Sequence, residues 1–179
     1  MRLTRRAMER GAPASASAYR ALYPWPWQPL VRESARARDM DPALVAAVIR
    51  QESSFTPGAT SAVGAVGLMQ IMPPVGRSLW DALGTARAGV PWAPALLRQP
   101  DVSVALGTRH LASSLAAYPD VAYALAAYNA GGTPVARWRR RAGTADPELF
   151  VERIPYDETR DYVRIVSRNR AFYSALYAR

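Results

Sequence analysis

The chain has 179 residues, half of them apolar, so it is long enough to bury the core of one compact domain. It has no cysteine, which excludes a disulfide framework and a thiolate metal site. The net charge of +9 comes from arginine alone, since the chain has no lysine. Such a charge favours polyanions of any kind, including nucleic acid, an anionic membrane and an acidic cell-wall polymer.

The first 24 residues are rich in Arg, Ala and Ser without periodicity, and we expect a flexible tail or the remnant of an upstream segment. Their basic start lacks the apolar run of a signal peptide, and no segment approaches the roughly 18 apolar residues of a membrane span. The chain as written carries no export signal, so it stays inside the cell or is a piece of a longer exported protein. YPWPWQP (23–29) breaks any helix, and residues 25–179 are predicted to form the main domain.

The rest of the chain predicts one helix after another. A first helix is expected from Gln28 to Arg38. Asp41 is a suitable N-cap and Pro42 a suitable first residue for PALVAAVIRQES. A short helix from Pro73 or Pro74 to Leu83 precedes a loop over 84–100, and further helices are predicted after Asp101 and Asp120, from Pro134, from Pro147 and from about Glu158 to Tyr177. No segment shows the alternation typical of a strand, so we predict an all-α domain.

The single histidine, His110, argues against a zinc or iron site, because such sites need several His or Cys ligands. We interpret it as a surface or packed residue, and we expect no metal and no organic cofactor. The cluster RWRRR (137–141) could clamp a nucleic acid strand by charge and stacking. A solvated helix end is the simpler interpretation, and we expect no nucleic acid partner.

Glu52 is the one carboxylate between residues 42 and 80, and it ends an apolar helix. Val45, Val48 and Ile49 share its face of the helix, the face that turns toward a core. Burial raises the pKa of a carboxyl, and so does the negative end of a helix dipole. An acid that stays protonated near neutral pH suits general acid catalysis. The alternative is an exposed glutamate on a frayed last turn.

Two polar clusters follow this acid in the sequence. SAVGAVGLMQIMP (61–73) has spaced glycines, which let a backbone approach a ligand, and Gln70, which offers both a donor and an acceptor. AAYNAGG (126–132) places Tyr128 and Asn129 at a helix end, a pattern that is equally typical of an ordinary C-cap. Neither cluster decides the function by itself.

Four motifs taken together are more specific, and in this order they resemble those of the soluble lytic transglycosylase (SLT) family: RQES (50–53), GAVGLMQIMP (64–73), AAYNAG (126–131) and IPYDETRDYV (154–163). The resemblance extends from about Tyr23 to Tyr177. It implies an all-α, lysozyme-like fold of the goose type. It also implies cleavage of the β-1,4 bond from N-acetylmuramic acid to N-acetylglucosamine in peptidoglycan.

By this similarity Glu52 is the single catalytic acid. It would protonate the glycosidic oxygen and then, as a base, deprotonate the C6 hydroxyl of the muramoyl sugar, which closes onto C1 and leaves a 1,6-anhydro end. An ordinary glycosidase pairs two carboxylates. Because this reaction takes its nucleophile from the substrate, the lack of an acid near Glu52 in the sequence is compatible with it.

The resemblance also implies substrate contacts from the loop after Glu52. Ser61 matches the family serine near the muramoyl N-acetyl group, although it could be an ordinary loop serine. Gln70 and Met72 match positions that line the saccharide groove, and Met72 could equally be a core residue.

Further contacts are implied by the third and fourth motifs. Tyr128 resembles the tyrosine that contacts the catalytic acid, and Asn129 its neighbour in the groove. Glu158 matches an acid that meets the peptide stem, but it could also pair with a nearby arginine or cap the last helix. Tyr156 and Tyr162 fit packing or groove roles, and the sequence does not separate these.

Large members of the family carry a long α-superhelical domain before the catalytic one, whereas here about 25 residues precede YPWPW. We therefore expect a catalytic domain alone, either a fragment or a minimal member, that acts as a monomer on peptidoglycan glycan strands. The expected place is the periplasm or cell envelope, with an export signal encoded upstream and peripheral contact with the envelope.

Three rival functions stay open. A goose-type lysozyme-like hydrolase needs a second carboxylate across the cleft, for which Asp81 and Asp101 are candidates. A non-catalytic peptidoglycan-binding module has no need of the acid, so the intact set of Glu52, Gln70 and Tyr128 argues against it. A nucleic-acid-binding helical domain rests on the arginine content alone.

Overall fold

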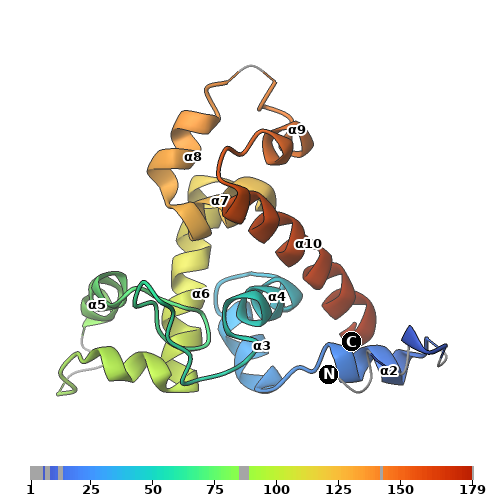
Figure 1. The fold of residues 1–179 in the computed structure, drawn as a ribbon. Coiled ribbons are helices and arrows are strands. Elements are labelled where there is room, and N and C mark those ends of the chain that lie inside the picture. The colour runs from blue at the N-terminus through green and yellow to red at the C-terminus, as the bar shows by residue number, and fades with distance from the viewer. Residues whose placement is uncertain (1–5, 7–8, 12–13, 85–88, 142, 179) are drawn as a thin grey trace.

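The computed structural model describes residues 6, 9–11, 14–84, 89–141 and 143–178, and these ranges are mostly helical (Figure 1). Two isolated β-bridges join Val66 to Thr60 and to Ile71. The predicted all-α domain is confirmed by the elements in chain order: α2 (Ala16–Leu22), α3 (Gln28–Arg36), α4 (Pro42–Ser53), α5 (Pro73–Asp81), the 3-10 helix η2 (Pro94–Arg98), α6 (Pro100–Ala117), α7 (Val121–Ala130), α8 (Gly132–Trp138), α9 (Pro147–Glu152) and α10 (Asp157–Tyr177).

Helix α4 lies at the centre of the fold (Figure 1). As predicted, Pro42 is its first residue, and the Asp41 carboxylate caps it by accepting a hydrogen bond of 2.8 Å from the backbone N–H of Ala43. Every residue from Ala43 to Ile49 is buried, because α10 packs along α4 and α3 also packs against it. Full burial of an aliphatic side chain stabilises a fold by roughly 1.5–3 kcal/mol. Helix α4 is therefore well stabilised and holds the residues at its C-terminal end in place.

Helix α10 is the second long support of the site. It crosses α4 and also packs against α7 (Figure 1). Tyr162, Val163 and Val166 are buried on its inner face. Arg170 reaches from α10 to the cap of α4, where its Nε lies 2.6 Å from a carboxylate oxygen of Asp41.

Some helix boundaries differ from the sequence predictions. Asp101 does not cap α6, which begins at Pro100 with Gln99 as its N-cap and Asp101 in its first turn. Proline is favoured at the first helical position, and here it outweighs the capping preference of aspartate. The expected loop over 84–100 contains η2, while residues 85–88 lie outside the described residues. Helix α8 begins two residues before the predicted Pro134.

The N-terminal segment is helical over Ala16–Leu22, which differs from a flexible tail there, while the alternative of a remnant of an upstream segment stays a prediction. Tyr19 of this helix stacks on Phe172 of α10, with ring centroids 5.6 Å apart. The Arg20 guanidinium donates hydrogen bonds to the carbonyl of Leu176. Residues 1–5, 7–8 and 12–13 lie outside the described residues, and the domain boundary near residue 24 stays a prediction. Within the described chain, no helix combines the length and the hydropathy that crossing a membrane requires.

Candidate active site

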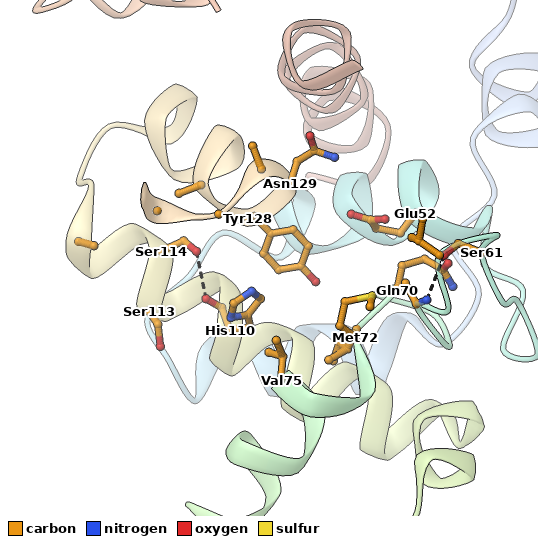
Figure 2. A pocket seen from close by; sticks show the side chains of 18 of the residues that line it. Glu52, Ser61, Gln70, Met72, Val75, His110, Ser113, Ser114, Tyr128 and Asn129 are labelled. Carbon is orange, nitrogen blue, oxygen red and sulfur yellow. Dashed lines mark hydrogen bonds between the residues drawn. The ribbon is translucent and has the colours of Figure 1, made fainter. Parts of the chain in front are cut away.

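A groove with a volume of about 700 Å³ lies between α4, α6, α7 and the start of α10. Its walls come from the end of α4, the loop between α4 and α5, one face of α6, the end of α7 and the first turn of α10. Figure 2 shows the side chains that point into it. Every site residue predicted from the sequence lies on this groove: Glu52, Ser61, Gln70, Met72, Tyr128, Asn129 and Glu158.

Glu52 sits in the last turn of α4, partly buried at the groove wall. As predicted, Val45, Val48 and Ile49 of the same face are fully buried. Its Oε1 accepts a hydrogen bond of 2.7 Å from the hydroxyl of Tyr162 on α10. The acid is therefore held at a fixed place between a packed helix and an open groove, which contradicts the alternative of a frayed, exposed last turn.

The surroundings of Glu52 favour its protonated form. Burial is the largest influence, and it raises the pKa of Glu52 from 4.5 to about 7. The Tyr162 hydrogen bond opposes this rise, because a donor stabilises the carboxylate, whereas the negative charge of Glu158 adds to it. A carboxyl with a pKa near 7 is present in both protonation states at neutral pH, as a group that first gives and then takes a proton requires.

The loop after α4 is fastened to three helices. Ser53 Oγ donates to the carbonyl of Leu68 at 2.8 Å, which ties the loop to α4. The backbone of Met69 is held from both sides, since its N–H donates to Ser103 Oγ of α6 at 3.3 Å and its carbonyl accepts from the Tyr128 hydroxyl of α7 at 2.8 Å. These bonds fix the loop that carries Ser61 and Gln70.

The direct hydrogen bond to the acid thus comes from Tyr162, whereas Tyr128 holds the loop backbone. The expectation that Tyr128 contacts the acid therefore finds no support as a hydrogen bond. Burial raises the pKa of both tyrosines, and the negative charge of Glu52 raises the pKa of each phenol further. The sequence did not decide between a packing role and a groove role for Tyr162, and the structure shows that its hydroxyl bonds to Glu52.

Two glycines let the loop pack closely against η2 and α6. Gly67 has φ +86°, and a Cβ there would stand 1.9 Å from the carbonyl oxygen of Leu97. Gly107 of α6 faces Met69, whose Sδ would lie 2.3 Å from an added Cβ. At Gly67 only glycine provides both the left-handed backbone and the missing side chain, so this glycine serves close packing, whereas a Cβ at Gly64 would meet nothing within 4 Å.

Ser61 and Gln70 stabilise the loop from within. Ser61 Oγ accepts from the N–H of Ala65 at 3.0 Å, so its own hydroxyl proton stays available to a ligand. Gln70 uses its amide nitrogen on the carbonyls of Gly67 at 2.8 Å and Ala59 at 3.2 Å. The carboxamide oxygen of Gln70 is then the group left to accept a hydrogen bond from the groove.

Apolar side chains form the rim of the groove on the loop side. Met72 is 39% exposed and Val63 is 76% exposed, and both line the groove together with Val75 of α5. Met72 is therefore a groove residue rather than a core residue, in line with the first of its two interpretations.

The opposite rim is built where α7 ends and α10 begins. Thr159 Oγ1 donates to Asn129 Oδ1 at 2.7 Å, which locks the two helix ends together. Glu158 lies in the first turn of α10 and lines the groove. Arg160, the arginine that Glu158 was considered to pair with, instead binds Asp157 and the carbonyl of Ile154.

The candidates for a second catalytic carboxylate are not where a hydrolase would need them. Asp81 pairs with Arg77 at the end of α5, Asp101 is exposed near the start of α6, and neither lines the groove. Among the described residues, Glu158 is the other carboxylate on the groove. Within these same ranges no three His, Cys, Asp or Glu side chains gather in a way that could hold a metal ion.

His110 is a groove residue that the sequence did not single out. It lies on α6, partly buried, with its ring centroid 5.0 Å from that of Tyr128 (Figure 2). Burial lowers the pKa of His110 from its usual value of 6.5. The sequence predicted a surface or packed residue, and no local signal distinguishes the groove side of this small-residue helix from its other sides.

Comparisons with known proteins agree with this geometry. The model of the transglycosylase SLT domain matches residues 29–151. The soluble lytic murein transglycosylase of Salmonella typhimurium is 35% identical over 160 residues, which cover 84% of this chain and 23% of that protein. The 70-kDa soluble lytic transglycosylase of Escherichia coli superposes with a TM-score of 0.82 at 30% identity, over 90% of this chain and 26% of that one.

A third similar protein is the lytic transglycosylase Slt of Pseudomonas aeruginosa, solved as an inactive mutant. It superposes with a TM-score of 0.81 at 28% identity, over 96% of this chain and 27% of that one. The chain thus spans about a quarter of the length of the relatives it matches. Fold and groove together define a lysozyme-like, all-helical domain with an acid in an open cleft. The chain belongs to the transglycosylase SLT domain family.

Proposed function

We propose that this domain is a peptidoglycan lytic transglycosylase, which cleaves the β-1,4 bond from N-acetylmuramic acid to N-acetylglucosamine and leaves a 1,6-anhydro end. The observation that carries the proposal is the Glu52 carboxyl on the groove wall, with its pKa raised to about 7 by burial. The family supports the reaction type, since its similar members are lytic murein transglycosylases.

The reaction needs one acid and no added nucleophile. The protonated Glu52 gives its proton to the glycosidic oxygen as the bond from that oxygen to C1 of the muramoyl sugar breaks. The Glu52 carboxylate then takes the proton of the C6 hydroxyl, whose oxygen forms the new bond to C1. The proton lost in the first step is regained in the second, and no water is consumed.

The arrangement of the groove supports a single-acid mechanism. Tyr162 fixes the carboxyl by a bond to one oxygen, which leaves the other oxygen for proton transfer. Gln70 and Ser61, each with an unused hydrogen-bonding atom, stand on the loop side as partners for polar groups of a sugar. The inactive form of the Pseudomonas aeruginosa relative has glutamine in place of a glutamate, which fits a reaction that depends on one acid.

Digestion of purified sacculi tests the proposal. The released muropeptides are weighed by mass spectrometry for the native chain and for Glu52→Gln. We expect products lighter by one water than reducing muropeptides from the native chain and none from the variant. Reducing ends would identify a hydrolase instead, and the absence of products from a folded native chain would contradict an enzymatic role for this domain.

A goose-type hydrolase is the second candidate, and one observation favours it. Glu158 lines the same groove, and its charge acts on Glu52. A hydrolase would use such a second carboxylate as a nucleophile or to activate water. Glu158→Gln separates the two reactions, because a transglycosylase keeps its chemical step without this carboxylate, whereas a hydrolase of this kind loses turnover as completely as with Glu52→Gln.

A binding module and a nucleic-acid-binding domain are less compatible with the structure. A pure binding module has no use for a carboxyl held at a pKa of about 7. For nucleic acid, the aromatic residue of the arginine cluster would have to stack on a base, but Trp138 is 2% exposed and packs edge-on against Tyr156. We therefore propose glycan strands of peptidoglycan as the partner and the periplasm or cell envelope as the place of action, with the positive net charge suited to an anionic wall polymer.

A further inference from the structure

The wall of the groove formed by α6 and its C-cap residue has four polar side chains, and three of them have their hydroxyl protons engaged by the protein. Ser113 Oγ donates to the carbonyl of Arg109 at 3.0 Å, and Ser114 Oγ to that of His110 at 3.3 Å. The Tyr118 hydroxyl donates to the carbonyl of Gly132 at 3.1 Å. The fourth polar side chain on this wall is the imidazole of His110.

In the described part of the chain, neither ring nitrogen of His110 forms a hydrogen bond with the protein. A nitrogen that lacked both a partner and access to solvent would be an orphaned buried group, and among the described side chains Trp25 Nε1 is the one such atom. The imidazole nitrogens therefore reach the open groove. Their hydrogen-bonding capacity is available to whatever lies there.

The ring of His110 is held in place and uncharged. It packs against Tyr128, with an angle of 48° between the two ring planes. Tyr128 is itself fixed by its bond to the carbonyl of Met69. Because burial lowers the pKa of His110, its imidazole is neutral at neutral pH and offers one donor and one acceptor. Sugar hydroxyl and acetamido groups are complementary to this pair.

We propose that His110 is a specificity-determining residue of the groove, whose imidazole forms a hydrogen bond with a hydroxyl or acetamido group of the sugar bound along α6. The inference rests on the proposed function, since it takes a glycan as the occupant of the groove. Figure 2 shows how the imidazole and the Glu52 carboxyl lie on either side of the Tyr128 ring. His110 thus contacts the substrate away from the bond that is cleaved.

The test uses two substitutions that separate the packing of the ring from its hydrogen-bonding capacity. His110→Phe preserves the aromatic contact with Tyr128 and removes both nitrogens, whereas His110→Gln preserves a donor and an acceptor. Asp101→Asn, on the same helix but outside the groove, is the control. Turnover of soluble glycan strands gives kcat and KM, and sedimentation with intact sacculi gives the binding affinity of each variant combined with Glu52→Gln.

We expect His110→Phe to raise KM about three- to tenfold, the effect of one neutral hydrogen bond, with kcat within about twofold of the native value. The affinity for sacculi of the Glu52→Gln form should fall by a similar factor, and His110→Gln should recover part of both losses. The control should match the native chain.

An unchanged KM and an unchanged affinity in His110→Phe would overturn the inference. So would a loss confined to kcat or to thermal stability, since that would make His110 a packing residue. The proposed function is tested separately by the products. If sacculi yield no anhydro products but binding still depends on His110, the proposed function fails and the glycan contact stands. If anhydro products appear and His110→Phe changes neither KM nor the affinity for sacculi, only the proposed contact of His110 with the glycan fails.

Discussion

The hydroxyl of Tyr162 donates a hydrogen bond of 2.7 Å to Oε1 of Glu52, across 110 residues of sequence. This bond joins α10 to the end of α4 and orients the candidate acid. It also acts on the protonation of the acid, because a donor stabilises the charged carboxylate and so lowers the pKa that burial raises. Tyr162 is thereby a positioning residue with a measurable electrostatic effect.

We expect Tyr162→Phe to raise the pKa of Glu52 further, since the bond that opposes the effect of burial is lost. In the proposed mechanism, activity above neutral pH depends on the protonated acid, so the alkaline limb of the pH profile should move to higher pH. At the same time kcat should fall about three- to tenfold, because the carboxyl has lost a bond of ordinary strength. Formation of anhydro products from pH 5 to 9 would measure both effects.

Tyr156→Phe is the matched control for this substitution. Tyr156 is 50% exposed and lies outside the groove. The loss of its hydroxyl should therefore change neither the alkaline limb of the pH profile nor kcat. A Tyr162→Phe variant whose profile keeps its native position would mean that the bond does not act on the acid.

Glu158→Gln should have the opposite effect on the pH profile. The charge of Glu158 raises the pKa of Glu52, so its removal should move the alkaline limb to lower pH, by less at high salt because the groove is open to screening. Asp161→Asn on the same helix, exposed and away from the groove, should leave the limb in place. A limb that does not respond to Glu158→Gln at low salt would show that the two carboxylates are not coupled.

Glu52→Gln should stabilise the fold at alkaline pH. The pKa of Glu52 is 4.5 in an ordinary setting and about 7 in the fold, so the native state holds this proton more tightly than the unfolded chain. The stability that this gives is fully present below about pH 4.5 and is lost as the pH rises through about 7. At pH 8.5 the variant should exceed the native free energy of unfolding by about 1–3 kcal/mol.

Denaturant titration at pH 4 and pH 8.5 measures this difference, which should nearly vanish at the lower pH. Glu33→Gln, which changes an exposed glutamate of α3, provides the control and should show no such pH dependence. A Glu52→Gln variant that is less stable than the native chain at pH 8.5 would contradict a raised pKa of Glu52 in the folded state.

Three glycine substitutions in the groove loop should separate the cost of a left-handed backbone from the cost of a steric clash in the free energy of unfolding. Gly58→Ala meets open space and should be almost neutral, whereas Gly64→Ala adds a side chain at φ +88° without a neighbour and should cost about 1 kcal/mol. Gly67→Ala adds both a left-handed backbone and a Cβ 1.9 Å from the carbonyl oxygen of Leu97, and should cost more than about 3 kcal/mol. Equal stability of Gly64→Ala and Gly67→Ala would mean that the loop shifts to relieve the clash at little cost in free energy.

The sequence predicted the parts of the site that depend on local pattern. Asp41 and Pro42 locate the start of α4, and the helical spacing of Val45 and Ile49 places Glu52 on the buried face. The predicted site residues all line the groove, because each lies near the end of a helix or in a loop whose form its own neighbours determine. Their individual roles stay predictions.

The sequence could not predict contacts that depend on how distant helices cross. Two tyrosines, Tyr128 and Tyr162, lie near the acid, and the pattern does not say which hydroxyl reaches the carboxyl. His110 lies on a helix that is buried on several sides, so periodicity alone does not indicate which side borders the groove. Helix α2 has a cap signal at Ser15, but its seven residues gain their packing from Phe172 of α10.

The bond between Tyr162 and Glu52 also has a consequence for the order of events during synthesis. The acid leaves the ribosome 110 residues before its hydroxyl partner, and until α10 docks, the apolar face of α4 remains open to water. In that state Glu52 is an ordinary solvated carboxylic acid, ionised at neutral pH. The protonated acid on which the proposed function depends therefore arises only after α10 has docked on α4.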